Sequence, residues 1–317
     1  MKNIDVLLAT YCGEKFVKEQ IVSVLKNFER VPQYNARIII SDDGSTDNTI
    51  NIINESFWRD KRVIIANDKR LGGVKHNFNF LINNTDADYV FFCDQDDVWL
   101  PEKISTFMAA FSAESNDKIP LLVHSDLCVT DGELNPIHPS MFEYQKINKT
   151  PSFENIVVSN SITGCVAAIN KPLLSLIQHS RVSESIMHDW YAGLIAAAFG
   201  RIVFIPQSLI LYRQHGSNQV GAQKFTLRKI FDPSFYMKTF HSIKLTRLQA
   251  IVFLDDFSQT LDTHKHKALE SYISSFDKGF LLRLRMCFFR GFTKYGASRT
   301  CAFIFFYVFL GYKIIHI

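Results

Sequence analysis

Three carboxylates stand close together in one segment of this 317-residue sequence. Asp94, Asp96 and Asp97 follow the apolar run 89–93 in the segment YVFFCDQDDVW. Acids at this spacing repel one another unless a cation or hydrogen-bond donors compensate their charge. Oxygen ligands of this kind suit Mg²⁺ or Mn²⁺, which commonly bind one or two carboxylates together with substrate phosphates. The segment therefore predicts a divalent-metal site for a phosphorylated substrate, with a solvated acidic turn as the alternative.

A second acidic segment, SDDGSTD, follows the apolar run 38–40. Asp47 is predicted to cap the next helix, because a short acidic side chain can accept hydrogen bonds from the first amides of a helix. Asp42 and Asp43 could accept hydrogen bonds from a nucleobase or a ribose hydroxyl. The spacing leaves open which of these two acids would do so.

Apolar strands and amphipathic helices alternate between these acidic segments. That alternation predicts an α/β fold with a mostly parallel sheet covered by helices on both faces. Ligands of such sheets bind beyond the carboxyl ends of the strands, so we expect ATYCGE, SDDGSTD and DQDD to meet at one edge. The predicted strands are 6–10, 37–40, 62–65, 89–93, 121–124 and 201–205, and the predicted helices include 14–27, 75–83, 171–178 and 188–199.

Two further polar segments lie at the same predicted edge. YRQHGSN follows the last predicted strand and offers Arg213 and His215 to a diphosphate, to a metal, or to both. The adjoining segment 216–221 is expected to act as a mobile lid. In DKRLGGVKHNF, Arg70 or Lys75 could hold a phosphate, and an ordinary solvated loop is the alternative.

Six motifs occur in an order that resembles family 2 glycosyltransferases of the GT-A fold. They are ATYCGEKF, SDDGSTDNT, DQDDVWLPEK, ITGCVAAINK, HDW and YRQHGSN, and the resemblance covers roughly residues 4–220. The resemblance implies an inverting transfer, in which an acceptor oxygen attacks the anomeric carbon while the nucleoside diphosphate leaves from the opposite face. It also implies Mn²⁺ or Mg²⁺ as the cofactor.

The resemblance assigns roles to particular residues. The metal would be held by the Asp-x-Asp motif of Asp94 and Asp96, with Gln95 between them, and by His215. Asp97 and Trp99 would lie against the donor sugar. The nucleotide-binding set that it implies is Thr10, Tyr11, Glu14, Asp42 or Asp43, Arg70, Asp94, Gln95, Trp99 and Arg213. Cys12 stands where the family usually has Asn, which changes the hydrogen bonds available there.

The family resemblance places the catalytic base at Asp189. An inverting attack needs a group that removes the acceptor proton as the new bond forms. Family members often have Glu-Asp at this position, whereas this chain has His188 followed by Asp189, so His188 is a competing candidate. Asp189 also stands at the start of a predicted helix, where it could simply complement the positive helix end.

The motifs look most like those of bacterial surface-polysaccharide enzymes, including rhamnosyltransferases that use dTDP-rhamnose. UDP-hexoses and their N-acetyl forms are alternative donors, and a lipid-linked oligosaccharide is the expected acceptor. A sugar nucleotidyltransferase is disfavoured, because ATYCGEKF lacks the Gly-rich basic loop of that class. A catalytically inactive membrane scaffold of the same fold is the rival from outside enzymology.

The predicted catalytic domain covers residues 1–224, and residues 225–317 form a basic, Phe-rich helical region. From Lys278 onward there are seven basic residues and no acid. This pairing of charge and apolar residues predicts amphipathic helices on a membrane surface, and a helical cap on the catalytic domain is the alternative. The apolar run 301–312 is shorter than the roughly 20 residues that span a bilayer.

Composition limits the class of protein further. A net charge of +4 and 47% hydrophobic residues argue against a disordered chain and against a nucleic-acid scaffold. The start of the chain lacks the pattern of a signal peptide, so we expect a cytoplasmic protein at the inner face of the cell membrane. The six cysteines lack metal-like spacing and are predicted to be buried, reduced thiols.

Overall fold

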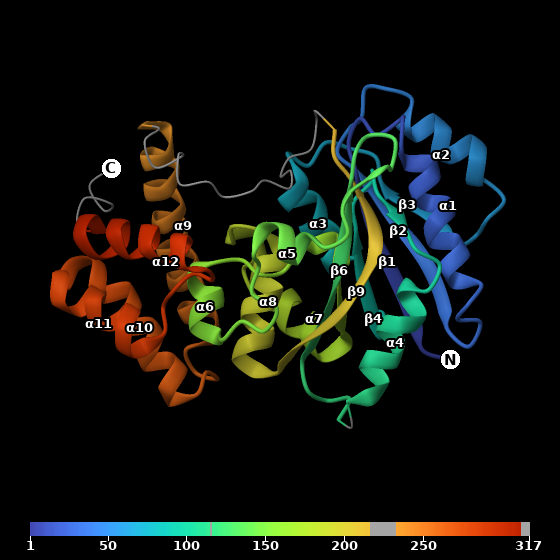
Figure 1. Cartoon of the computed structure of the whole chain (residues 1–317). Coiled ribbons are helices and arrows are strands. Elements are labelled where there is room, and N and C mark those ends of the chain that lie inside the picture. Colours follow the sequence, from blue (N-terminus) through green and yellow to red (C-terminus); the bar gives the residue numbers. More distant parts are fainter. Residues whose placement is uncertain (115, 216–232, 312–317) are drawn as a thin grey trace.

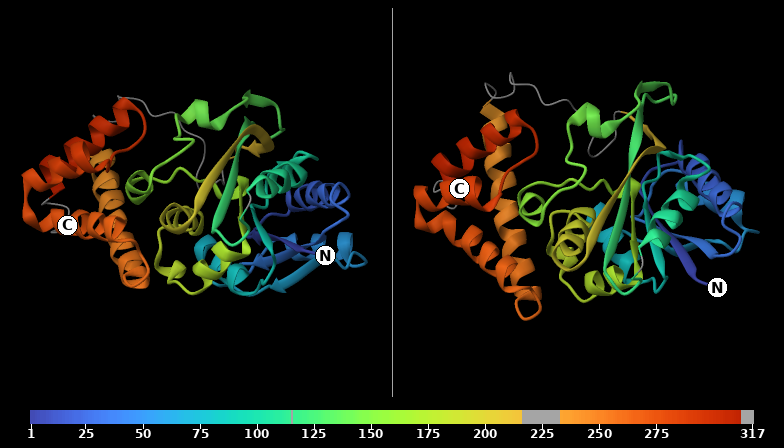
Figure 2. Two further views of the ribbon diagram at one scale, coloured as in Figure 1. Left: turned by 90° about the horizontal axis from the view of Figure 1, so that it is seen from below. Right: turned by 60° about the horizontal axis from the view of Figure 1, so that its bottom comes forward.

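A single sheet with helices on both faces carries the segments that the sequence singles out (Figure 1). The computed structural model describes residues 1–114, 116–215 and 233–311. Helices from the C-terminal third form a separate group beside this sheet, with α6 and α8 lying between the two (Figures 1 and 2). The described residues therefore form two packed parts that meet along α6 and α8.

The sheet has the strand order β3-β2-β1-β4-β8-β6-β9-β5, and β7 pairs with β6. The first four strands are parallel, as predicted, and β8 runs antiparallel to both of its neighbours. As a result, the carboxyl ends of β1, β2, β4, β6 and β9 and the amino end of β8 lie at one edge of the sheet. The strands are β1 (Asn3–Thr10), β2 (Asn35–Asp42), β3 (Val63–Asn67), β4 (Tyr89–Cys93), β5 (Val98–Trp99), β6 (Leu121–Thr130), β7 (Pro136–His138), β8 (Ala167–Asn170) and β9 (Arg201–Arg213).

Both faces of the sheet are buried, because alternate residues of each strand enter two different cores. In β1, Leu7 packs into one core, whereas Val6 and Leu8 pack into the other. Helices α1 (Val17–Phe28), α2 (Thr49–Phe57) and α4 (Lys103–Ala113) cover the face of Val6. The opposite face is covered by α3 (Val74–Asn83), α7 (Lys171–Gln178) and α8 (His188–Phe199). Two short helices, α5 (Met141–Gln145) and α6 (Phe153–Val158), lie in the connection between β7 and β8.

The predicted bounds of β4 and α7 match the observed ones, whereas the predicted strands at β6 and β9 are shorter than the observed strands. The cause is polar residues inside a long, irregular pairing between these two strands. Their register shifts on both sides of Asp126, whose buried carboxylate accepts hydrogen bonds from Ser140 Oγ and the Phe142 amide. A buried acid satisfied by distant residues interrupts the apolar pattern without ending the strand.

The C-terminal helices share a core with the rest of the chain. Helix α9 (Pro233–Phe257) buries Phe253 against Tyr191 and Phe199 of α8, and Asp256 pairs with Arg181 at 2.7 Å. The next helices are α10 (Thr263–Lys278), α11 (Phe280–Arg290) and α12 (Ala297–Ile304), which continues as a π-helix over Phe305–Phe309. These contacts are of the kind expected for a helical cap on the catalytic domain. Several aromatic residues of the C-terminal helices, among them Phe288 and Phe289, are nevertheless exposed.

No helix among the described ranges is both long enough and apolar enough to cross a membrane. The six cysteines are free, and Cys93, Cys165 and Cys287 are buried as predicted. The expectation of burial is wrong for Cys12 and Cys301, which are exposed. Cys12 lies in the loop after β1 with a φ of 50°, a turn position where the chain leaves the sheet edge.

Candidate active site

The end of β4 brings the acids of the DQDD turn close to the start of α8. Burial first, and then the charges of Asp96 and Asp189, raise the pKa of Asp94 to about 7. Electrostatic coupling of this kind requires short separations, so these three carboxylates lie near one another at this edge of the sheet. The antiparallel β8 makes this possible, because its amino end and the start of α8 both come to the edge where β4 ends.

The end of β9 brings a predicted metal ligand to the same turn. His215 Nε2 lies 2.8 Å from Asp96 Oδ2, and its ring packs against Phe16 with the ring centroids 4.9 Å apart. Asp94 and Asp96 follow β4, and His215 follows β9, so carboxylate and imidazole groups from two non-adjacent strands come together at one edge of the sheet. The predicted lid, 216–221, lies outside the described residues.

This set of ligands fits a divalent cation. A cation would relieve the repulsion that raises the pKa of Asp94, and oxygen and imidazole ligands suit Mn²⁺ or Mg²⁺. Among the residues that the structure describes, the group of three candidate ligands with atoms within 4.8 Å of one another is Asp94 with Asp97 and Cys165, and it does not include His215. That group is less suitable, because Asp97 and Cys165 are buried beneath the turn beside the ammonium of Lys103.

Lys103 is a buried cation behind the DQDD turn, and our sequence analysis missed it. Its Nζ donates a hydrogen bond to the Cys165 carbonyl at 2.7 Å and lies 3.3 Å from the centre of the Trp99 ring. Burial lowers the pKa of Lys103 to about 7, and the nearby thiols and carboxylates oppose that shift. The residue belongs to the DQDDVWLPEK motif, which was the available signal, but its position beneath Asp94 and Asp97 depends on the fold.

The structure corrects the expected role of Trp99. Its side chain is 2% exposed and packs in the core against Phe91, with the ring centroids 6.0 Å apart. Asp97, expected beside it at the donor sugar, is also buried and accepts the Arg213 amide at 3.2 Å. Both residues support the turn from below, because the short strand β5 returns the chain into the core to pair with β9.

Arg213 also differs from the expectation that it faces a diphosphate. Its side chain is 5% exposed, and its Nε and Nη1 donate to the carbonyls of Asp96 and Gly132 at 2.9 and 2.7 Å. Its Nη2 pairs with Glu19 of α1 at 2.5 Å. The guanidinium therefore holds the DQDD turn between β9 and α1, and a diphosphate would have to displace these bonds.

Gln95 joins the loop after β1 to the loop after β4. Its Oε1 accepts the Tyr11 amide at 2.8 Å, and its Nε2 donates to the Tyr11 carbonyl at 2.9 Å. A Cβ added to Gly13 would lie 2.3 Å from the same Oε1, so this contact requires glycine at that position. The clasp leaves the Tyr11 ring 54% exposed at the edge of the cleft.

Thr10 and Asp42 are joined inside the fold. Thr10 Oγ1 donates to Asp42 Oδ2 at 2.7 Å, and Asp42 also accepts the amide and the hydroxyl of Ser45 at 2.6 Å each. Both side chains are buried, at 1% and 0% exposed. The expectation that they contact the nucleotide is therefore corrected, since their side chains hold the ends of β1 and β2 together.

Asp43 organises the loop before α3. Its carboxylate accepts the amides of Leu71, Gly72 and Gly73 at 2.5 to 2.8 Å, so three of its four acceptor positions are used. Arg70, which precedes these amides, is exposed and makes no ion pair with a described residue. Lys75, the alternative phosphate ligand, is instead bound to the Ser185 carbonyl at 3.1 Å.

Glu14 contacts the start of α2 rather than open solvent. Its Oε2 accepts the Asn48 amide at 3.0 Å, and its own amide donates to Asp47 Oδ2 at 3.1 Å. Asp47 also accepts the Thr49 amide at 3.0 Å, but the N-cap residue of α2 is Asn48, one residue later than the sequence predicts. The half-buried Glu14 thus fixes α2 beside the loop after β1.

Asp189 lies in the first turn of α8 with its carboxylate held by neighbouring groups. Its Oδ2 accepts the Gly164 amide at 3.0 Å, and its Oδ1 accepts the Trp190 amide at 2.6 Å and Asn160 Nδ2 at 3.4 Å. Burial raises the pKa of Asp189 to about 6 against the effect of these hydrogen bonds. The hydrogen bond from the Trp190 amide is the contact expected if Asp189 only complements the positive end of its helix. The charge of Asp189 also raises the pKa of Asp94, so the two carboxylates lie near each other.

His188 does not compete for the role of base. Its ring stacks on Phe78 with the centroids 3.8 Å apart, and no described residue forms a hydrogen bond to either ring nitrogen. Burial lowers the pKa of His188 to about 3, so the ring stays neutral. A base needs access to the acceptor proton, and His188 is enclosed beneath Gly164.

Comparison with known proteins identifies the class. Residues 5–174 match the model of the family described as Glycosyl transferase family 2, so the chain belongs to that family and uses a nucleotide-sugar donor. One relative, named dTDP-rhamnosyl transferase RfbG from Shigella flexneri, is 30% identical over 229 residues, covering 68% of this chain and 74% of the relative. Another, glycosyltransferase GlyG from Streptococcus pneumoniae, is 24% identical over 312 residues, covering 90% of this chain and 96% of the relative.

Two solved structures share the fold. TarS 1–349 from S. aureus, in complex with UDP-GlcNAc, aligns with a TM-score of 0.56 at 16% identity, over 92% of this chain and 74% of that chain. The mannosyltransferase PcManGT from Pyrobaculum calidifontis, in complex with GDP-Man and Mn²⁺, aligns with a TM-score of 0.52 at 13% identity, over 86% and 69%. These matches confirm the predicted α/β GT-A-like fold.

The two hydrogen bonds between the Gln95 side chain and the Tyr11 backbone can be tested with a double mutant. Gly13→Ala should displace Gln95 and lose both hydrogen bonds to Tyr11, at a cost of about 1 to 3 kcal/mol in the free energy of unfolding. Gln95→Ala should cost about as much. Because Gln95 supplies the nearest atoms to the added Cβ, Gly13→Ala should be almost neutral in the Gln95→Ala background. Urea unfolding of the four proteins checks this, and additive costs would contradict it.

Proposed function

We propose that this family 2 enzyme is an inverting, divalent-metal-dependent glycosyltransferase of the hexosyl type. It transfers a sugar from a nucleoside diphosphate to a hydroxyl of a saccharide acceptor in bacterial surface-polysaccharide synthesis, such as O-antigen or capsule. The observation that carries the proposal is that Asp94, Asp96, His215 and Asp189 lie near one another at one edge of the sheet. In the proposed complex, the metal ligands and the candidate base lie on opposite sides of the reacting sugar.

The donor side of the cleft is formed by loops after β1, β2, β3 and β4. Asp94, Asp96 and His215 would hold Mn²⁺ or Mg²⁺, which neutralises the departing diphosphate. The exposed cation of Arg70 can pair with a phosphate, and the exposed Tyr11 ring offers a face for a nucleobase. Both acids proposed to read the base are buried and accept three hydrogen bonds each, and we propose Asp43 for this role because it is 7% exposed whereas Asp42 is fully enclosed.

Asp189 is the proposed base on the acceptor side. It takes the proton of the acceptor hydroxyl as the oxygen attacks the anomeric carbon from the face opposite the diphosphate. The amide of Gly164 and the side chain of Asn160 fix the direction of its carboxylate. A pKa of about 6 makes Asp189 ionised at neutral pH yet basic enough to accept a proton.

For the donor we propose dTDP-rhamnose, with UDP-hexoses or UDP-N-acetylhexosamines as the alternative. The relative named as a dTDP-rhamnosyl transferase, at 30% identity, supports the first choice. The acceptor is proposed to be a lipid-linked oligosaccharide, which requires the enzyme to work beside a membrane. An inactive scaffold of the same fold would have no reason to retain Asp94, Asp96 and Asp189 in one cleft.

A membrane contact is supported by one exposed stripe of α11. Leu281, Arg285, Phe288 and Phe289 recur at helical spacing and are exposed. The exposed Lys278 and the half-buried Arg290 add charge beside them. Apolar residues flanked by Arg and Lys are typical of helices that lie on an anionic membrane surface. We propose that this stripe contacts the inner face of the cell membrane from the cytoplasm.

The first test concerns the metal site. A thermal-shift screen of dTDP-, UDP- and GDP-sugars should show stabilisation by the correct donor that depends on Mn²⁺, about 2.7 kcal/mol at 100 times the dissociation constant. Asp96→Ala should lose the Mn²⁺-dependent part of this shift and abolish transfer, because the carboxylate that pairs with His215 is gone. Asp117→Ala, an exposed acid elsewhere, is the matched control. Normal activity of Asp96→Ala at ordinary Mn²⁺ concentrations would refute the assignment.

The second test concerns the base. Asp189→Asn should lower kcat by about 10² to 10⁴-fold while donor binding persists. In the wild-type protein, activity should fall as pH drops through about 6, because the raised pKa means that Asp189 becomes protonated there and can no longer accept a proton. His188→Leu keeps the apolar surroundings and loses no hydrogen bond to a described residue, so it should retain turnover. Loss of activity in His188→Leu with Asp189→Asn active would reverse the two roles.

The third test concerns the membrane. The triple variant Leu281→Ser, Phe288→Ser and Phe289→Ser should lose most of its co-sedimentation with anionic vesicles, since it removes exposed apolar area and no core residue. Trp58→Ser, an exposed aromatic residue on the far side of the sheet, is the control. Deleting residues 278–317 is a poorer test, because Met286, Phe292 and Tyr307 are core residues. Equal binding by the triple variant and the wild-type protein would rule out this stripe.

A further inference from the structure

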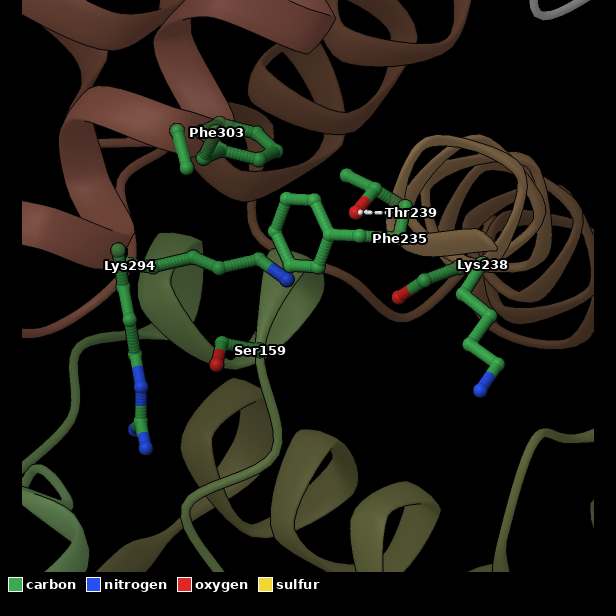
Figure 3. Close-up of a pocket in the computed structure, with 9 residues that line it drawn as sticks. Ser159, Phe235, Lys238, Thr239, Lys294 and Phe303 are labelled. Carbon is green, nitrogen blue, oxygen red and sulfur yellow. Dashed lines mark hydrogen bonds between the residues drawn. The ribbon is translucent and has the colours of Figure 1, made fainter. Parts of the chain in front are cut away.

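A cavity of about 320 Å³ lies between the catalytic part and the C-terminal helices, away from the donor side of the cleft. Figure 3 shows it between α9 and the segment that carries Lys294, with Ser159 below. Lys238 and Phe235 come from α9, and Arg299 and Phe303 from α12. The size falls in the range of small-molecule sites, roughly 300 to 1,000 Å³.

The charge of this cavity is one-sided. Three of its described lining residues, Lys238, Lys294 and Arg299, are cations, and none is acidic. Neither lysine forms an ion pair with a residue that the structure describes. Arg299 donates to the Lys146 carbonyl at 3.3 Å, which leaves its charge uncompensated. Cations that line one cavity without acidic partners can bind an anion with several oxygens, and Lys238 among them is exposed.

Lys294 is the most enclosed of the three cations. Figure 3 shows its side chain reaching across the cavity toward Phe235. Burial, and then repulsion by Arg299, lower the pKa of Lys294 to about 8. A bound anion would offset both effects, so the cavity gains more from an anionic ligand than a lysine at the surface would.

The cavity adjoins the proposed base. Ser159 lines it, and the next residue, Asn160, donates to Asp189 Oδ1 at 3.4 Å. The segment that forms one wall of the cavity therefore also orients the carboxylate that faces the acceptor. Phe235 and Phe303 supply apolar surface beside the cations, and α12 leads into the exposed aromatic residues Phe305 and Phe309. The arrangement suits an anion attached to an apolar chain on one side and to a sugar on the other.

We propose that this cavity binds the diphosphate of a lipid-linked saccharide acceptor. The proposal rests on the transferase function argued above and names the acceptor chemistry for the same site. Lys238, Lys294 and Arg299 hold the diphosphate, the lipid chain leaves toward the aromatic residues of α12, and the attached saccharide extends past Asn160 to Asp189. The cavity thereby selects acceptors that carry a diphosphate.

The test measures binding of farnesyl diphosphate and of inorganic diphosphate to the full chain by calorimetry in metal-free buffer. Removing the metal suppresses binding of diphosphates in the donor cleft. Both probes should bind the wild-type protein and compete with each other, and farnesyl diphosphate should bind more tightly. The double variant Lys238→Gln and Lys294→Gln should weaken both by at least about tenfold, one decade of affinity being about 1.4 kcal/mol. Lys267→Gln, an exposed lysine of α10 outside the cavity, should bind as the wild-type protein does.

Three outcomes would overturn the proposal. The double variant could bind both probes with wild-type affinity, or Lys267→Gln could weaken binding equally, which would indicate bulk charge. Phosphatidylglycerol vesicles could also displace farnesyl diphosphate as well as inorganic diphosphate does, which would indicate a phospholipid headgroup. The Mn²⁺-dependent thermal shift by sugar nucleotides should persist in the double variant. Its absence from the wild-type protein would instead count against the proposed transferase function, so the two failures are distinguishable.

Discussion

Negative charge concentrated at the end of β4 is the constraint on which the site depends. Asp94, Asp96 and Asp97 stand within four residues, and partly buried carboxylates need compensation. The fold supplies it from different directions: the buried ammonium of Lys103 lies beneath, and the guanidinium of Arg213 binds the turn from the side. The negative charge that these cations leave uncompensated is where we propose that a divalent cation binds.

The antiparallel strand β8 places the acceptor side against this charge. Its reversal brings Gly164 and the start of α8 to the edge where the parallel strands end, and the Gly164 amide then holds Asp189. A wholly parallel sheet would put that strand's amino end at the far edge. The proposed donor site therefore uses loops after parallel strands, and the proposed base comes from a helix beside the one reversed strand.

The C-terminal helices have two surfaces with different chemistry. Toward the sheet, Phe253 and its neighbours complete the core around α8, and Lys294 and Arg299 line a cationic cavity beside Asn160. Away from the sheet, Phe288 and Phe289 are exposed beside basic residues. The C-terminal helices thus pack beside the proposed base and expose apolar side chains on their other surface. In our proposal, this arrangement lets a membrane-bound acceptor reach Asp189.

The sequence by itself determined the α/β class, the parallel order of the first strands, and the set of polar segments at one edge. Apolar periodicity and motif order are local properties, and they were sufficient for the bounds of β4 and α7 and for placing His215 at the same edge as Asp94 and Asp96. Only the tertiary structure decided which members of those segments face the cleft. Trp99, Arg213, Thr10 and Asp42 turn inward because hydrogen bonds and packing partners far along the chain bury them, and no local pattern records those partners. The same reason hid Lys103 and the cationic cavity, whose residues meet only after distant elements pack together.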